Sequence, residues 1–475
     1  MADIYEIQWR YGLITAMLML LLNEFVFYKV FISTIFSVFF LLLMVFAAFF
    51  RRQWLLLLIF VGGLLFNTRP RELHLVDLEL RGNFEYFSPN IIKIFGFTHS
   101  TLFYVFLLVV VLFWLGRNYR LSAFISEIEL RFLQAMGLII ISSTFMAFFN
   151  ETLNFRYIVQ DLKFIIFVII GFFLCKVLDL TPEKFIRLIL WIGLTLGSLT
   201  FFNIIVDVIA GESKLSYNSS TLFSVAVFGF VIFRARTILS LKLLVYTLAA
   251  IPLTRGEMLS FGFTIFVLLG LAISQVSTGF NKTVIWRALL LLGITLAGVI
   301  YIIYLYSEPL FNFMAMKVLF FITADLSVDA SSSIRTEELK AVFMIDKPID
   351  VIQLLFGSGF GGGMSFDDSF IYALGNADFP AEQIRDNYFV QPHFFGTYYI
   401  LKFGLIGTLL WLLVFIIPYF FAKNSHLRIL YVFMSFCFLW ESYWIPFYAI
   451  FLGVFISVLL RDGRDRVQVQ TSHRS

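Results

Sequence analysis

The sequence has few of the residues on which disulfide-bonded domains, metal sites and soluble enzymes depend. Only two cysteines occur, Cys175 and Cys437, and both lie inside apolar runs, so they can form neither a disulfide framework nor a zinc site. Charged residues make up 14% of the 475 positions, and the net charge of +4 is too small to indicate nucleic-acid binding. The segments that are predicted below to face outward contain no DxD or HExxH pattern, so the sequence indicates no metal and no cofactor.

Apolar residues dominate the chain instead. They account for 60% of it, and the mean hydropathy is +0.91. This composition lies outside the range of soluble domains and predicts a polytopic membrane protein that buries apolar surface in lipid and between helices. The first apolar run begins near Tyr11 behind a lead of mixed charge and without a small-residue cleavage site, so we expect a retained span.

The apolar runs predict an all-α protein with about 12 to 14 transmembrane helices, some of them shorter than the ~20 residues that a full crossing needs. Residues 1–306 and 397–460 are expected to be membrane helices, 307–396 a periplasmic loop domain, and 461–475 a cytoplasmic tail. The runs lie at residues 12–28, 31–50, 54–66, 101–116, 132–149, 163–178, 185–210, 219–233, 240–254, 257–275, 287–306, 397–421, 427–441 and 445–460.

Lys and Arg in the short loops predict which side of the membrane each loop faces, because they gather on the cytoplasmic side. When every apolar run is taken as a crossing, most of the short basic loops fall on one side. Both termini are then cytoplasmic. The outward segments are 67–100, 150–162, 211–218, the junction at Arg255, 307–396 and 441–444.

Arg255 is an unusual residue for its place, because it lies between two apolar runs on the outward side, where positive charge is not favoured. A guanidinium is costly to bury in hydrocarbon and is almost never neutral. It either sets the topology by reaching toward the headgroups, or it binds an anion at the edge of the membrane.

The outward segment 307–396 is the only long segment that we expect to fold outside the bilayer core. It holds 12 Asp and Glu and five Lys and Arg, a net charge of −7. Its stretch 331–364 predicts a helix after Ile334, with the serines at 331–333 as caps and Pro348 near the stop. Arg335 in the first turn either points toward the membrane surface or pairs with Glu338.

A glycine-rich run follows in the same segment, with Gly357, Gly359 and Gly361 at alternate positions. It resembles a phosphate loop only superficially, because no strand precedes it and no Lys-Ser/Thr pair follows it. Glycines let backbone N–H groups converge on an anion, or let one chain approach another closely. An ordinary flexible turn is the alternative that we favour.

His393 is the histidine that lies next to both the long segment and a span, and it is therefore a candidate general base. A lone histidine is more often structural or solvated, and that alternative stays open.

Four more charged residues in the outward segments are weaker candidates: Arg156, Lys163, Arg385 and Glu441. The first two flank the start of a span, where they either add phosphate contacts or are surface charges, and we favour surface charge. Arg385 either contacts a sugar or pairs with a neighbouring acidic residue, Asp386 or Glu382. Glu441, between the two closing spans, either orients a hydroxyl or histidine or faces the headgroups.

Three segments in this order resemble the O-antigen ligase and O-antigen polymerase superfamily of bacterial inner membranes. They are LTRGEMLSF at 253–261, IRTEELKAVFMIDKP with LFGSGFGGG within 334–363, and PHFFGTYYILKFGLIGTLLWLL at 392–413. In that family a span-edge arginine-glycine pair is followed by an arginine helix in an outer loop, a glycine-phenylalanine-glycine turn, and a histidine that opens a GLIG helix. The similarity covers roughly residues 240–420.

The resemblance implies a metal-independent glycosyltransferase with a GT-C-like fold, active on the periplasmic face of the inner membrane. Its donor would be an oligosaccharide on undecaprenyl diphosphate, with Arg255 and Arg335 on the diphosphate and His393 as the base. The partners implied are the lipid-linked donor and acceptor and membrane lipids, with room for a chain-length regulator. The reaction would serve lipopolysaccharide or other surface-polysaccharide biosynthesis.

The family contains two activities that differ in the acceptor. A polymerase transfers the glycan to the non-reducing end of another lipid-linked repeat unit, and a ligase transfers it to the lipid A core. We favour the polymerase, because the acidic loop suits a sugar acceptor better than an anionic core. A flippase or other transporter is a further alternative, but charges at span ends and the lack of an obvious internal repeat favour an enzyme.

Overall fold

The computed structural model describes part of the 475-residue chain, mainly in its middle and C-terminal regions. Arg255 and His393 lie outside the described residues, and so do most positions of the predicted spans at 12–66 and 219–306. The described residues are 14, 15, 17, 18, 35, 38, 39, 42–46, 93, 94, 97–117, 125–149, 155–209, 223, 226, 227, 230, 301, 304, 305, 312, 330–344, 348–366, 381–392, 394–441 and 446–472.

The described part of the chain is mostly helical, as the sequence predicts. Two antiparallel strands of two residues each, β1 (Lys93–Ile94) and β2 (Phe97–Thr98), precede the first long helix. The helices are α4 (His99–Arg117), α6 (Glu127–Ala147), α7 (Phe155–Val177), α8 (Pro182–Ile209), α14 (Ala330–Phe343), α15 (Pro348–Phe356), α17 (Ala381–Arg385), α18 (Phe395–Phe421), α19 (Ser425–Glu441) and α20 (Pro446–Ser472).

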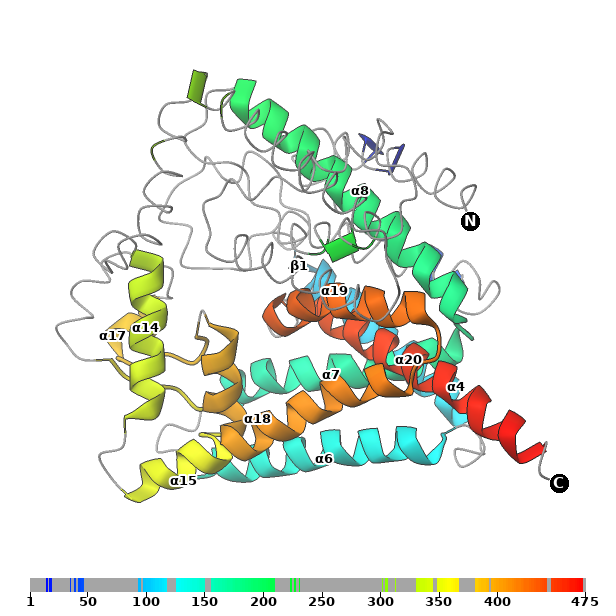
Figure 1. Cartoon of the computed structure of the whole chain (residues 1–475). Coiled ribbons are helices and arrows are strands. Elements are labelled where there is room, and N and C mark those ends of the chain that lie inside the picture. The colour runs from blue at the N-terminus through cyan, green and yellow to red at the C-terminus, as the bar shows by residue number, and fades with distance from the viewer. Residues whose placement is uncertain are drawn as a thin grey trace.

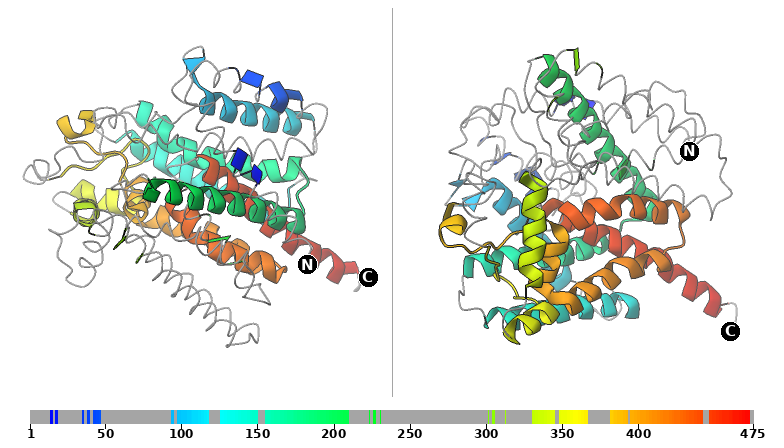
Figure 2. Two further views of the ribbon diagram at one scale, coloured as in Figure 1. Left: turned by 90° about the horizontal axis from the view of Figure 1, so that it is seen from above. Right: turned by 60° about the vertical axis from the view of Figure 1, so that its left-hand side comes forward.

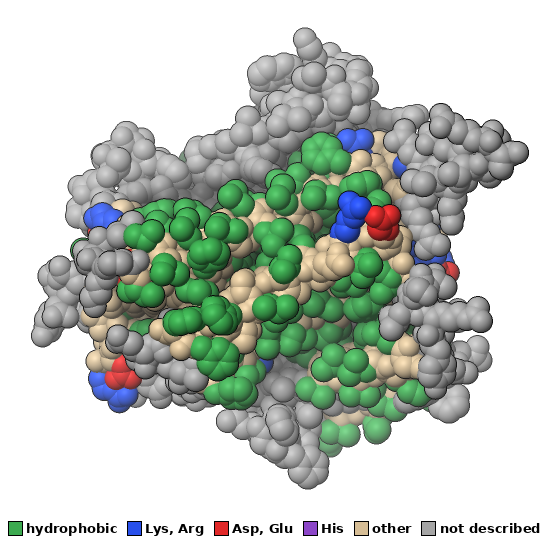
Figure 3. Space-filling view, turned by 90° about the horizontal axis from the view of Figure 1, so that it is seen from below, with side chains coloured by type: hydrophobic (Ala, Val, Ile, Leu, Met, Phe, Trp, Pro, Cys, Tyr) green, Lys and Arg blue, Asp and Glu red, His purple; other side chains and the backbone are tan. Residues whose placement is uncertain are grey.

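Three of the described helices are long and apolar enough to cross a membrane: α6 and α18, and α7 from Tyr157 onward. Many of their large apolar side chains are exposed, including Leu138, Ile141 and Leu409 at 60% or more. On the side where α6, α15 and α18 lie in Figure 1, the face in Figure 3 is covered mostly by hydrophobic side chains. A surface of this kind fits lipid and not water, which supports a membrane protein.

Helices α7 and α20 pack closely, and two glycines permit the approach. A Cβ at Gly171 would overlap the backbone of Ile450, and a Cβ at Gly453 would overlap the backbone of Val168. Small residues at helix crossings have this role in membrane proteins, where van der Waals packing replaces the hydrophobic effect between helices. The contact places α7 inside the helical assembly, beside α18 and α20 (Figure 1).

A capping box starts α6 several residues before its apolar run. Ser126 caps the helix, and its backbone N–H donates to the Glu129 carboxylate at 2.7 Å. The same carboxylate binds the Lys176 ammonium, at the last turn of α7, at 2.7 Å. Both side chains of this ion pair are buried. The start of α6 is thereby tied to the end of α7.

In the outer segment, residues 307–396, the stretch 331–364 contains parts of two helices, α14 and α15, where the sequence predicts one. The serines at 331–333 lie inside α14, which begins at Ala330, so their prediction as caps is wrong. The helix predicted after Ile334 is α14, which ends at Phe343, and Pro348 is the first residue of the next helix, α15. The correction has a simple cause, since the first turn of a helix needs no N–H from proline and its fixed φ suits that position.

The outer segment has a small hydrophobic cluster of its own. Residues from four stretches form it, one of them in α18, and Met364 and Phe389 pair as an antiparallel bridge through backbone hydrogen bonds of 3.0 and 2.9 Å. Next to the bridge, Asn387 has φ of 44° and its side chain bonds both backbone groups of Phe366. The buried members of the cluster are Ile334, Met364, Phe366, Phe389 and Leu401.

Candidate functional site

The candidate site lies where the outer segment meets the first turns of α18. In Figure 1 and in the right-hand view of Figure 2, α14 stands at that end of the helical assembly, with α15 and α17 near it. The described residues on either side of His393 belong to this region.

Helix α14 brings Arg335 into the neighbourhood of His393. Glu338 is fully buried, and its carboxylate accepts a hydrogen bond of 3.1 Å from the backbone N–H of Phe394, the residue after His393. Arg335 precedes Glu338 by three positions on the same helix and is partly buried, so the two side chains share one face. The described contact therefore joins the helix of Arg335 to Phe394, while His393 itself lies outside the described residues.

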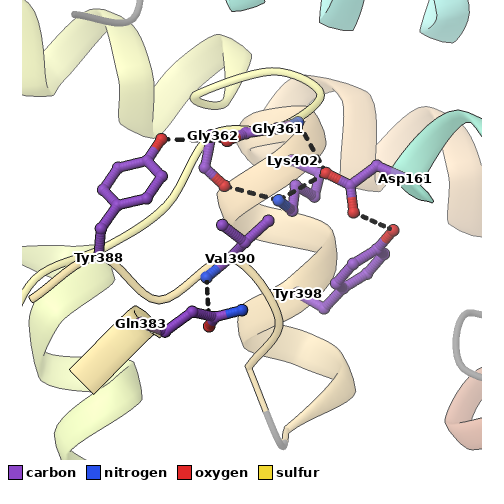
Figure 4. Close-up of polar contacts among 8 residues, drawn as sticks. All are labelled: Asp161, Gly361, Gly362, Gln383, Tyr388, Val390, Tyr398 and Lys402. Carbon is purple, nitrogen blue, oxygen red and sulfur yellow. Dashed lines mark hydrogen bonds and ion pairs between the residues drawn. The ribbon is translucent and has the colours of Figure 1, made fainter. Parts of the chain in front are cut away.

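The chain before His393 is also fixed. The Gln383 side chain in α17 accepts the backbone N–H of Val390 at 3.2 Å, and both residues are buried. The Tyr388 hydroxyl donates to the carbonyl of Gly361 at 3.0 Å (Figure 4). The segment that leads to His393 is thus attached to α17 on one side and to the glycine turn on the other.

The glycine turn, residues 357–363, is a buried part of the structure and not a flexible surface turn. Gly357, Gly359 and Gly361 have φ of 83°, 78° and 75°, which only glycine adopts readily. A Cβ at Gly357 would overlap the backbone of α18, and one at Gly359 would overlap the backbone of α6 at Ser143 and Ala147. Our preference for an ordinary flexible turn was wrong, because close approach to two helices requires these glycines.

The turn is bonded to both helices through its backbone. Ser358 N–H donates to the Leu401 carbonyl of α18 at 2.7 Å, and Phe360 N–H donates to the Ser143 carbonyl of α6 at 3.0 Å. Helix α18 is interrupted next to this contact, at Gly404, where φ is 68°. Inside a membrane, a helix carbonyl that loses its N–H partner at such an interruption needs another donor. For the Leu401 carbonyl the turn supplies the Ser358 N–H.

A fully buried ion pair lies beneath the turn. The Lys402 ammonium of α18 is 2.6 Å from the Asp161 carboxylate of α7, and neither side chain has exposed surface. Asp161 also accepts the Gly361 N–H at 2.7 Å and the Tyr398 hydroxyl at 3.2 Å. Lys402 donates to the Gly362 carbonyl at 2.6 Å (Figure 4). Besides each other, the two buried charges thus have three hydrogen-bond partners, as buried charges require.

Sequence analysis did not single out Asp161 and Lys402. The signal was present, because Lys402 lies inside the apolar run 397–421 and an ionisable residue within a span needs a partner. The anion that the Gly361 N–H contacts is a carboxylate of the protein itself, that of Asp161. These two residues hold the turn between α7 and α18.

The weaker candidates differ in their surroundings. Arg385 pairs with Asp386 through hydrogen bonds of 2.8 and 3.3 Å, as one alternative predicted, and both side chains are exposed. The Arg385 hydrogen bonds lower the pKa of Asp386 from its ordinary value. Lys163 is exposed on α7. Arg156 lies in the first turn of α7 and Glu441 is the last residue of α19, and only their backbones are described.

No family model, curated protein or solved structure matches this chain. Among the residues that the structure describes, no three His, Cys, Asp or Glu side chains are grouped as metal ligands.

Proposed function

We propose that this chain is a metal-independent glycosyltransferase, and that it acts as an O-antigen or surface-polysaccharide polymerase. It would transfer a glycan from undecaprenyl diphosphate to the non-reducing end of a lipid-linked repeat unit at the outer face of the inner membrane. The observation that carries the proposal is the hydrogen bond from Phe394 N–H to Glu338, because it joins the helix of Arg335 to the chain at His393.

The proposed chemistry needs a cation and a base at the same membrane edge. The anomeric carbon of the donor forms a bond to the acceptor hydroxyl oxygen while its bond to the diphosphate breaks. His393 would take the hydroxyl proton, since imidazole suits this task near neutral pH. Arg335 and Arg255 would bind the diphosphate oxygens, and the planar guanidinium can do so with two bonds as charge grows on the leaving group.

Buried polar contacts hold the described chain on either side of the proposed base. The chain before His393 is bonded to Gln383 and the chain after it to Glu338, and both of those side chains are buried. A base must lie within hydrogen-bond reach of the proton it removes, and fixed supports reduce the cost of reaching that geometry.

A transfer assay with purified protein tests the proposed activity. The protein in detergent is incubated with a lipid-linked repeat unit, with and without lipid A core, and the products are separated by size. A ladder of lengthened lipid-linked glycan without core is expected for a polymerase. Product only in the presence of core would identify a ligase, and no glycan transfer in either reaction would leave transport as the better explanation.

Two variants test the proposed residues within the same assay. Removal of a general base typically lowers a rate by about 10² to 10⁴, so His393→Ala should nearly abolish transfer and keep most donor binding. Arg335→Lys keeps the charge and loses the two-bond geometry, so both donor affinity and transfer rate should fall. Arg131→Lys, at an exposed pair with Glu127, is the matched control and should leave both unchanged. Normal single-turnover transfer in His393→Ala would exclude this base.

A further inference from the structure

Helix α15 exposes its apolar side chains and partly buries its polar ones, which is the opposite of what a helix in water does. Its polar residues Asp350 and Gln353 are partly buried, and five large apolar side chains are between 38% and 46% exposed. A helix on a water-facing segment turns its apolar stripe inward. The exposed apolar residues are Ile349, Val351, Ile352, Leu355 and Phe356.

The end of α15 lies deep along a candidate membrane span. A Cβ at Gly404 of α18 would overlap the Leu355 carbonyl and the Gly357 N–H, so these backbones are in contact. Gly404 follows the start of α18 at Phe395 by nine positions, which is about 13 Å at 1.5 Å per residue. The end of α15 therefore lies more than two helical turns from the outer end of α18.

The exposed apolar face of α15 is continuous with exposed apolar surface on α6 and α18, two of the helices that can cross a membrane. Ile406 and Leu409, just past Gly404 on α18, are 50% and 61% exposed, and Phe145 near the end of α6 is 61% exposed. Helix α15 packs against both α18 and α6. With nine residues it spans about 13 Å, too short to cross a bilayer whose hydrocarbon core is about 30 Å thick.

Backbone that is not helical can lie at membrane depth only if its N–H and C=O groups are hydrogen-bonded inside the protein. The turn after α15 meets this condition. Ser358 and Phe360 donate to carbonyls of α18 and α6. The Gly361 N–H and the Gly362 carbonyl bond to Asp161 and Lys402. Residues 357–362 are all buried.

We propose that residues 348–364 form a re-entrant segment of the membrane domain. Helix α15 enters the outer leaflet with its apolar face against lipid hydrocarbon, and the glycine turn returns the chain within the protein. The predicted domain division, which places all of 307–396 outside the bilayer, is revised for this segment. The proposal concerns the surroundings of α15 and does not depend on the proposed enzyme activity.

Spin-label accessibility in a bilayer tests the proposal. Ile352→Cys is labelled with a nitroxide and reconstituted in phosphatidylcholine–phosphatidylglycerol vesicles, and its collision with oxygen is compared with its collision with a water-soluble nickel complex. Leu413→Cys, 53% exposed on α18, is the lipid control, and Asp386→Cys is the water control. Unmodified protein measures background labelling, which should be low because Cys175 and Cys437 are buried.

The expected result at 352 is a higher accessibility to oxygen than to the nickel complex, as at 413 and opposite to 386. The reverse ratio at 352 would place α15 in water and overturn the proposal. Low accessibility to both reagents would mean that a protein surface covers α15, and this also overturns it. Ile349→Cys and Phe356→Cys on the same face repeat the test, so that a folding defect in one variant does not decide it.

Discussion

The Asp161–Lys402 ion pair offers a quantitative prediction because both side chains are fully buried. Removal of one partner leaves the other charge without its counter-charge, which costs about 3–5 kcal/mol in buried pairs. One kcal/mol lowers Tm by roughly 2–4 °C in domains of 150–250 residues, so each single variant should lose on the order of 10 °C. The variants are Asp161→Asn and Lys402→Met.

The double variant should recover part of this loss. With both charges absent, the desolvation cost disappears, and Asn at 161 still accepts from the Gly361 N–H. The Gly362 carbonyl loses the Lys402 donor, and an unsatisfied buried acceptor costs about 1–3 kcal/mol. The double variant is therefore expected to melt above either single variant but below the unmodified protein.

The buried Glu129–Lys176 pair, between α6 and α7, provides a matched control that shares helix α7 with the first pair. Lys176→Met leaves the Glu129 carboxylate with the Ser126 N–H and hydroxyl at 2.7 and 2.9 Å. Asp161 likewise keeps two donors in Lys402→Met, the Gly361 N–H and the Tyr398 hydroxyl, but that variant also leaves the Gly362 carbonyl without its donor. The Tm loss in Lys176→Met should therefore be smaller than in Lys402→Met.

All of these variants are compared by their thermal stability in detergent. The readout is the monodisperse size-exclusion peak that remains after heating. Additive losses in the double variant would show that Asp161 and Lys402 are not energetically coupled. Equal losses in Lys402→Met and Lys176→Met would refute the reasoning from burial and alternative partners.

Two further predictions concern the glycine turn and the exposed arginine. Gly359→Ala combines a positive φ with overlap of the α6 backbone at Ser143, so it should lower the free energy of unfolding by about 1–3 kcal/mol or more. Gly137→Ala is the control, because nothing lies within 4 Å of the added Cβ, and it should be neutral or slightly stabilising. Equal effects of the two substitutions would contradict the close packing of the turn. Arg385→Ala removes the exposed pair with Asp386 and should leave transfer rate and Tm unchanged; a large fall in transfer rate alone would instead indicate a sugar contact.

The sequence predicted the helical part of the fold well where apolar runs continue for many residues. The run 397–421 corresponds to α18, and the run 185–210 corresponds to α8. Agreement was poorer at polar helix ends, because hydropathy does not register a capping box such as that of Ser126 and Glu129. Similarly, α20 continues from its apolar run through the predicted tail as far as Ser472.

The candidate site was predicted only in part, for a physical reason. Lys402 within a span implies an acidic partner, but no local pattern identifies that partner as Asp161 on a helix far away in the sequence. The positive φ angles of the glycine turn could be predicted from the glycines themselves, whereas the two helices that the turn contacts could not. Likewise, Glu338 could be assigned to a helix but not to the backbone N–H of Phe394.

The interruption of α18 at Gly404 has a mechanical consequence for how the protein meets bilayers of different thickness. Spans accommodate a thicker or thinner bilayer mainly by tilting. In α18 the piece before Gly404 is fastened to α7 through Tyr398 and Lys402, while the piece after it has many lipid-exposed residues. Because the backbone at Gly404 is not helical, we expect the piece after it to tilt with the lipid while the piece before it keeps its orientation against α7.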